Sequence, residues 1–106
     1  MQRQAYPDVA AKIRRWAQKP NPNITYGYRL RGGGTHSLEE MAKDGIDFND
    51  MLRVLRTCRI TDLRQERGEW RHKAEGRDKD GRDLVFIVNL SDEIEEIEIV
   101  TAWAVR

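Results

Sequence analysis

The side chains best suited to proton transfer in this chain are its two histidines, His36 and His72. An imidazole titrates near neutral pH, so it can serve as a general base or a general acid without special tuning. His72 lies between Arg71 and Lys73, and His36 comes just before a predicted helix start. RNA cleavage without a metal ion needs a base for the 2′-hydroxyl, an acid for the leaving 5′-oxygen and a cation near the phosphate. The chain contains these group types, with either histidine available as base or acid.

The cations of this chemistry come from one predicted strand, with the sequence EWRHKAEGR over residues 69–77. Alternation along a strand sends Arg71, Lys73 and Arg77 to one face. The other face then carries Trp70, His72 and Ala74. A row of basic side chains on an open sheet face can bind phosphate groups electrostatically. The alternative is an ordinary solvated face, because enough acidic residues lie nearby in the sequence to form cross-strand ion pairs.

Three helices are predicted ahead of the strands. The first lies within residues 1–19 and ends before Pro20, and its apolar side chains share one face: Tyr6, Val9, Ile13 and Trp16. Residues 36–58 form two more helices joined at Gly45. Ser37 and Glu40 have the spacing of a capping box ahead of the stripe Leu38, Met41 and Ala42. Asp47 is placed to cap the last helix, whose predicted buried face is Phe48, Met51, Leu52 and Leu55.

The period of the apolar residues changes from 3.6 to 2 after the helices, which predicts an antiparallel meander over residues 59–106. Its strands are 60–67, 70–77, 83–90 and 94–105, with the third central because it carries Leu84, Phe86 and Val88. Residues 24–30 are either a further strand or an extended arm. Trp70 and Trp103 are predicted as core anchors rather than stacking platforms. The residues of the last strand that are predicted to share one face are Ile97, Ile99, Thr101, Trp103 and Val105.

Composition limits the class of protein. A chain of 106 residues is one domain, 1–106, and the expected fold class is α+β, with N-terminal helices packed on a four-stranded antiparallel sheet. Net charge is +1, but residues 1–35 hold seven Lys or Arg and one Asp, whereas residues 90–106 hold one Arg and five acidic residues. Such asymmetry suits a local anion site or a charged protein partner.

Targeting and cofactor signals are sparse. A lone cysteine, Cys58, is expected to close a helix as a small apolar residue and favours a reducing compartment. We expect a cytoplasmic protein with no signal peptide and no membrane span. No His, Cys, Asp and Glu cluster has metal-ligand spacing, so neither a metal nor a cofactor is expected.

From about residue 24 onward, the chain resembles the domain-of-unknown-function family 4258. The matching motifs are His36 with Ser37, Met41, Gly45 with Ile46, and the run Val-Thr-Ala-Trp at 100–103. One departure is Glu40, where the family usually has Arg. The segment GIDFNDMLRVL at 45–55 and the basic strand are also similar to toxins of the motility quorum-sensing regulator type. Both groups are similar to RelE-like ribonuclease toxins, whose fold places helices on a curved antiparallel sheet.

The resemblance implies a metal-independent endoribonuclease toxin neutralised by a cognate antitoxin. The catalytic set that we predict is His36, His72, Arg71 and Thr101, and the RNA-binding set is Arg71, Lys73, Arg77 and Arg82. Thr101 would offer a hydrogen bond to the reacting phosphate. The alternative is a non-enzymatic module that holds a protein partner on the same sheet face. Neither the RNA sequence recognised nor the oligomeric state follows from the sequence.

Overall fold

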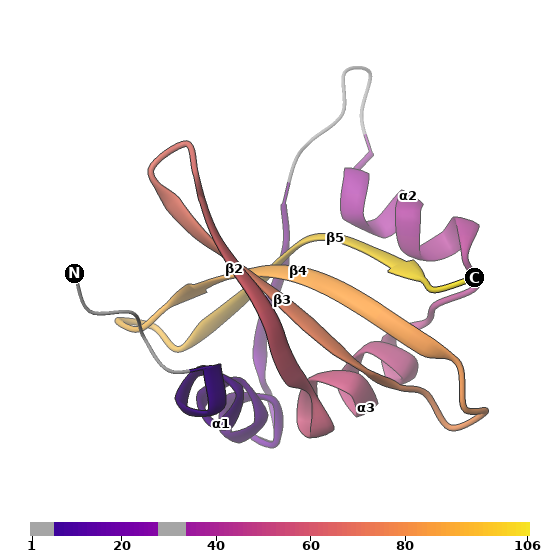
Figure 1. Cartoon of the computed structure of the whole chain (residues 1–106), viewed down its shortest axis with the longest axis horizontal. Helices are drawn as coiled ribbons and strands as arrows, with labels where there is room; N and C mark the ends of the chain where they lie inside the picture. Colours follow the sequence, from indigo (N-terminus) through magenta and orange to yellow (C-terminus); the bar gives the residue numbers. More distant parts are fainter. Residues whose placement is uncertain (1–5, 28–33) are drawn as a thin grey trace.

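The computed structural model describes residues 6–27 and 34–106. Within these ranges it contains three helices and five strands, in the order α1 (Tyr6–Ala17), β1 (Asn23–Tyr26), α2 (His36–Lys43), α3 (Phe48–Thr57), β2 (Arg59–Glu66), β3 (Glu69–Arg77), β4 (Asp83–Ser91) and β5 (Glu96–Ala104). Figure 1 shows the helices packed against one curved sheet. The predicted α+β class with an N-terminal helix first is confirmed. No helix in these ranges is long and apolar enough to span a membrane.

The prediction of a four-stranded antiparallel sheet is wrong in one respect. The described strands form a five-stranded mixed sheet in the order β1-β5-β4-β3-β2, in which β1 pairs with β5 in parallel and all other pairs are antiparallel. A four-residue strand gives too short an alternation to distinguish from an extended arm. Of the segment 24–30, residues 24–26 belong to β1, and residues 28–30 lie outside the described part of the chain.

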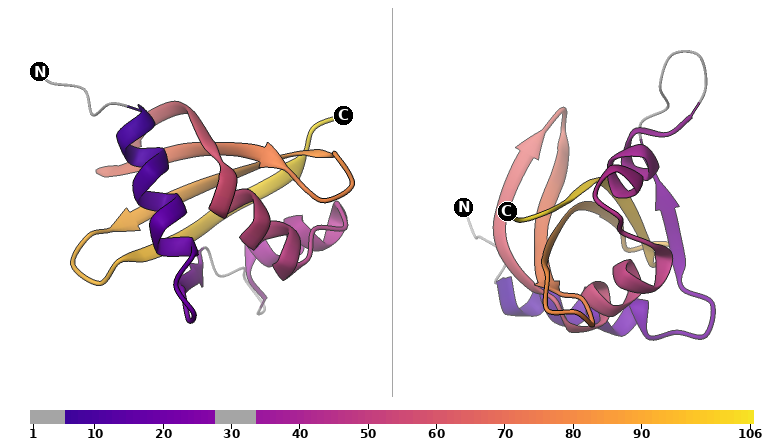
Figure 2. Two further views of the ribbon diagram at one scale, coloured as in Figure 1. Left: turned by 90° about the horizontal axis from the view of Figure 1, so that it is seen from below. Right: turned by 90° about the vertical axis from the view of Figure 1, so that its right-hand side faces the viewer.

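Helices α1 and α3 cover one face of the sheet, as the view from below in Figure 2 shows. The predicted inner face of α1 is confirmed, since Val9, Ile13 and Trp16 are buried. The predicted cap of α3 is also confirmed. The Asp47 carboxylate accepts a hydrogen bond from the Asp50 N–H at 2.8 Å, and Asp50 accepts one from the Asp47 N–H at 2.9 Å.

The buried stripe of α3 begins one turn later than predicted. Met51, Val54 and Leu55 are buried, whereas Phe48 is 50% exposed. Phe48 is the first residue of the helix, and its side chain is half-exposed to solvent. The prediction that Phe48 belongs to the core is therefore wrong.

Helix α2 begins at a different cap from the predicted one. Thr35 is the N-cap residue, and Ser37 lies inside the helix with its hydroxyl 3.5 Å from the Gly27 carbonyl oxygen. Of the predicted apolar stripe only Met41 is buried, while Leu38 and Ala42 are exposed. Gly45 has a φ of 64°, so the predicted left-handed joint between α2 and α3 is confirmed.

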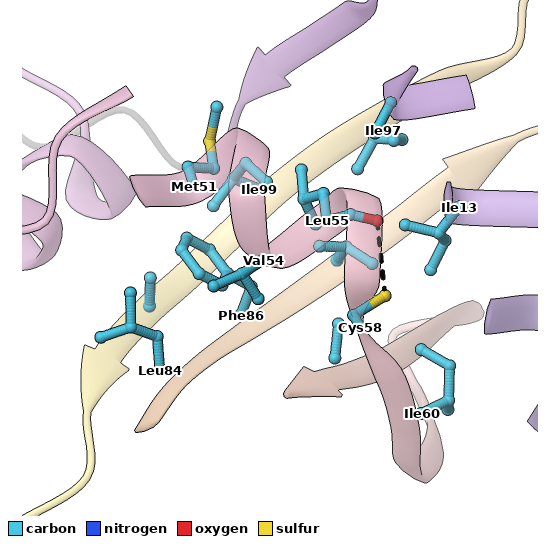
Figure 3. Close-up of a cluster of buried hydrophobic side chains, with 14 of the residues drawn as sticks. Ile13, Met51, Val54, Leu55, Cys58, Ile60, Leu84, Phe86, Ile97 and Ile99 are labelled. Atoms are coloured by element: carbon cyan, nitrogen blue, oxygen red, sulfur yellow. Dashed lines mark hydrogen bonds between the residues drawn. The ribbon is translucent and has the colours of Figure 1, made fainter. Parts of the chain in front are cut away.

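The core lies between the sheet and the pair α1 and α3 (Figure 3). Leu84, Phe86 and Val88 of β4 are all 1% exposed or less, which confirms the prediction that this strand is central. Cys58 ends α3 and is buried, with its Sγ 3.7 Å from the Leu55 carbonyl oxygen. Burial raises the pKa of the Cys58 thiol to about 11, so this cysteine packs as an apolar residue, as predicted.

A β-bulge in β5 decides which side chains face away from the core. Ile87 pairs with Thr101 and Val88 pairs with Ile99, so Val100 is an extra residue on β5. After the bulge Ala102 is buried in the core, and Thr101 and Trp103 take the opposite face. The prediction that Ile97, Ile99, Thr101 and Trp103 share one face is therefore wrong.

The two tryptophans predicted as core anchors are both partly exposed. Trp103 is 36% exposed because the bulge turns it away from the core. Trp70 is 43% exposed and pairs with Gln65 near the tip of the β2–β3 hairpin, which Figure 1 shows extending away from the helices. Among the described residues, the tryptophan that fills the core is Trp16 of α1.

Candidate functional site

A cleft of about 410 Å³ lies on the side of the sheet opposite α1 and α3, which we call the open face. Strands β2 to β5 supply its floor and α2 supplies one wall. Four of the predicted site residues line it: His36, Arg71, Lys73 and Thr101. The other lining residues are Asp62, Arg64, Glu66, Ile87, Val100 and Trp103. Residues from five elements thus meet in one hollow.

The pairing of the strands explains why these residues meet. Lys73 pairs with Asp62 on one side and with Ile87 on the other, and Ile87 pairs with Thr101. Paired residues in neighbouring strands turn their side chains to the same face. The bulge at Val100 brings Thr101 into this row. Regular alternation from the buried Ile99 would have turned the Thr101 side chain toward the core.

His36 enters the cleft from the first residue of α2. Its side chain is 37% exposed, and its Nδ1 lies 4.0 Å from Oε1 of Glu40, one turn along the helix. The opposite end of α2 is attached to β5, since the Asp44 carboxylate accepts a hydrogen bond from the Ala104 N–H at 2.7 Å. This attachment lies in the part of β5 beyond its pairing with β1. Helix α2 therefore holds the imidazole over the open face from a fixed position.

Arg71 is the most enclosed cation of the cleft, at 6% exposed. Its Nε lies 4.0 Å from Oε2 of Glu66, a residue of the neighbouring strand β2. A guanidinium held in a sheet face presents several N–H donors in a fixed plane, which suits the oxygens of a phosphate or carboxylate group. Arg71 is thus built into the floor of the cleft rather than extending from its rim.

The other two cations also have carboxylate neighbours. The Nε of Arg64 donates to Asp62 at 3.1 Å, and Nζ of Lys73 is 3.8 Å from Oε2 of Glu75. The pKa of the Asp62 carboxyl lies below its usual range because it accepts a hydrogen bond from the Leu63 N–H, with Arg64 adding to the effect. Asp62 is therefore ionised at neutral pH. The cleft lining holds three cations and two carboxylates, so it is only slightly positive.

Trp103 lies at one end of the cleft, where its cross-strand partner Val85 is buried on the same face. The other two apolar lining residues lie elsewhere: Ile87 stands in the row between Lys73 and Thr101, and Val100 also lines the neighbouring acidic cavity. Sequence reasoning missed the end at Trp103 because it placed this residue in the core.

The neighbouring part of the open face is acidic. A smaller cavity of about 120 Å³ shares Arg71 and Val100 with the cleft and is also lined by Glu69, Asn89 and Glu98. The Asn89 amide donates to Glu69 at 3.1 Å and to Glu98 at 3.0 Å, while its buried Oδ1 has no hydrogen-bond partner. On the open face, Arg71 therefore borders a region that carries the carboxylates of Glu69 and Glu98.

Comparisons with protein-family models, with curated proteins and with solved structures found no match to this chain. The fold and the cleft therefore carry the functional argument.

His72 does not lie in the cleft. It is 5% exposed, on the opposite face from Lys73, and its Nδ1 is 3.4 Å from the Val88 carbonyl oxygen. Burial lowers the pKa of His72, with a smaller contribution from Lys12. The two histidines thus occupy opposite faces of the sheet and cannot act as a base and acid on one phosphate.

Arg77 and Arg82 also lie outside the cleft lining. Arg77 is exposed and its Nε donates to Asp83 at 3.1 Å. Arg82 donates to Asp78 at 2.8 Å and to the carbonyl oxygens of Asp44 and Gly45. The sequence does hold one sign that Arg82 is not an RNA-binding residue. Asp78 lies four residues before it, across a turn, and is placed to form an ion pair with it.

Arg64 is the cation that sequence reasoning missed. Between Ile60 and Asp62 the pairing of β2 with β3 shifts by one residue, so Thr61 is extra and Arg64 pairs with Arg71. The two arginines face the same cleft although they belong to different strands. A bulge of this kind leaves no clear mark in the sequence. In residues 6–27 and 34–106, no group of three or more His, Cys, Asp or Glu is arranged to hold a metal ion.

Proposed function

We propose that the open-face cleft binds RNA and cleaves it without a metal ion, and that the protein is the toxin of a toxin–antitoxin pair. The observation that carries this proposal is the joint presence of His36, Arg71, Lys73 and Thr101 in one cleft. A titratable base, two cations and a hydroxyl can assist 2′-hydroxyl attack on a phosphate, with solvent as the acid for the leaving oxygen. The resemblance to RelE-like toxins supports the antitoxin partner.

In the proposed mechanism His36 removes the proton of the 2′-hydroxyl as that oxygen bonds to phosphorus. The bond from phosphorus to the 5′-oxygen breaks, and the leaving oxygen takes a proton from solvent. Arg71 and Lys73 stabilise the charge that builds on the non-bridging oxygens, and Thr101 donates a hydrogen bond to one of them. The products are a 2′,3′-cyclic phosphate and a 5′-hydroxyl end.

Positive charge in the cleft is offset by the carboxylates of Asp62 and Glu66. RNA must therefore compete with these carboxylates for Arg64 and Arg71. We expect moderate affinity and a short footprint rather than the tight binding of a strongly basic surface.

The first test uses the purified protein, single-stranded RNA and EDTA. We expect cleavage products with cyclic phosphate ends, and no cleavage of DNA of the same sequence, because DNA lacks the attacking hydroxyl. The His36→Gln variant should lower the cleavage rate roughly 10²–10⁴-fold, the usual size of a general acid–base contribution. RNA that stays intact in the presence of the parent protein would refute the proposed ribonuclease activity.

A matched pair on β3 tests the binding cleft. Lys73→Ala should weaken RNA binding and reduce its salt slope by about one, because one phosphate contact is lost. Arg77→Ala removes the same charge from the same strand outside the cleft and should leave both quantities unchanged. Equal effects of the two variants would indicate general surface charge rather than a site.

The second candidate function is a protein-binding module, favoured by the acidic region around Glu69, Asn89 and Glu98. This region would repel a polyanion and suits a basic segment of a protein partner. A parent protein that neither binds nor cleaves RNA, but loses a protein partner when Glu98 is changed to Gln, would support this candidate over the first.

A further inference from the structure

At one end of the open-face cleft a partly exposed aromatic ring lies beside the row that contains Lys73 and Thr101. Trp103 is 36% exposed and lines the cleft with Ile87 and Val100. Its cross-strand neighbour Val85 is buried on the same face. The indole therefore stands beside Val85 on the open face and is partly exposed where it lines the cleft.

We propose that Trp103 forms a nucleobase subsite, so that the cleft takes an unpaired nucleotide with its base stacked on the indole. This inference rests on the proposed function and names its substrate class, single-stranded RNA. An aromatic side chain beside a cationic groove matches the two halves of a nucleotide, an apolar base and an anionic phosphate. Bases within a duplex are stacked on one another and cannot reach such a ring.

The order of residues along β5 supports the placement. Thr101 and Trp103 are two residues apart and face the same way after the bulge, which separates them by about 7 Å along the strand. Thr101 pairs with Ile87, which pairs with Lys73, so the polar groups lie in one cross-strand row and the indole lies beside it. A nucleotide can therefore place its phosphate at the row and its base at Trp103.

Trp70 provides a matched control for Trp103. It is 43% exposed, so the two tryptophans have similar exposure. Trp70, however, lines a different cavity, together with Lys12, His72 and Asp92. Any general effect of removing an exposed indole should appear in both variants, whereas loss of a base subsite should appear only when Trp103 is changed.

The experiment measures dissociation constants for a 2′-O-methylated RNA hexanucleotide, which cannot be cleaved, and for the same backbone without bases. We expect the parent protein to bind the base-bearing strand about tenfold or more tightly than the abasic one, the range expected for stacking of a single base. Trp103→Ala should remove most of this preference and Trp103→Phe should keep part of it. Trp70→Ala should change neither constant.

The outcomes separate this inference from the proposed function. Equal binding of both strands by the parent protein overturns the base subsite and leaves the phosphate cleft standing. Equal effects of Trp70→Ala and Trp103→Ala also overturn it. Binding of neither strand overturns both proposals. If Trp103→Ala does not fold, the comparison of the two strands on the parent protein and the Trp103→Phe variant still decides.

Discussion

Two histidines with the same side-chain chemistry have different surroundings in this fold. His36 is partly exposed at the start of a helix and faces a charged cleft. His72 is buried on the core side of β3, where an imidazolium ion loses most of its hydration. Burial lowers the pKa of His72, so the ring is neutral in the folded protein at neutral pH. His72 is therefore a packed residue of the core side, whereas His36 is the histidine that lines the cleft.

This difference predicts a pH dependence of stability. The unfolded chain protonates His72 below its ordinary pKa of 6.5, whereas the folded chain resists protonation until lower pH. The unfolded state therefore binds more protons in this window, and the free energy of unfolding should fall as pH drops below about 6.5. Denaturation by urea at pH 7.5, 6.5 and 5.5 measures the slope. His72→Gln should flatten this slope, and an unchanged slope in His72→Gln would refute the assignment.

At the scale of elements, the position of a residue within its helix or strand decides its burial more than its type does. The chain has two phenylalanines, Phe48 and Phe86. Phe48 opens α3 and is half-exposed, whereas Phe86 lies in the middle of the central strand and is fully buried. Both were expected to be core residues from their periodicity.

The two phenylalanines make a matched stability test. Phe86→Ala should lower the free energy of unfolding by about 3–5 kcal/mol, because it removes a buried ring and leaves a cavity. Phe48→Ala should cost about 0.5 kcal/mol or less, as for other surface changes. Chemical denaturation monitored by circular dichroism gives both values. Similar losses for the two variants would contradict the placement of Phe48 at the surface.

At the scale of the whole molecule, one arginine joins distant parts of the chain. Arg82 follows the β3–β4 turn and donates to Asp78 in that turn and to the carbonyl oxygens of Asp44 and Gly45 between α2 and α3. Asp44 in turn accepts hydrogen bonds from the Ala104 N–H and from Arg106. These contacts connect the helix that carries His36 to both β4 and β5.

Arg82 should therefore act on stability rather than on RNA contact. Arg82→Ala should lower the melting temperature, since it leaves two carbonyl oxygens and the Asp78 carboxylate without this donor. Its affinity for a short RNA at a temperature well below melting should equal that of the parent protein. Lys73→Ala should give the reverse pattern, with reduced affinity and little change in melting temperature. A loss of affinity in Arg82→Ala without a loss of stability would restore Arg82 to the binding set.

Local patterns in the sequence determined the elements, because capping, turn chemistry and apolar spacing act over a few residues. The three helices, the Asp47 cap, the joint at Gly45 and the central strand all follow from them. So does the grouping of Arg71 and Lys73 on one face, since alternation along a strand is a property of the backbone.

Only the tertiary structure decided which residues share the cleft. The bulges at Thr61 and Val100 each shift the alternation by one residue, and a one-residue shift moves every later side chain to the other face. This brought Arg64, Thr101 and Trp103 to the open face. The parallel pairing of β1 with β5 and the position of α2 beyond it depend on contacts between residues far apart in the chain. The spacing of residues along the chain does not predict such contacts. The set of residues that lines the cleft could therefore be identified only in the folded structure.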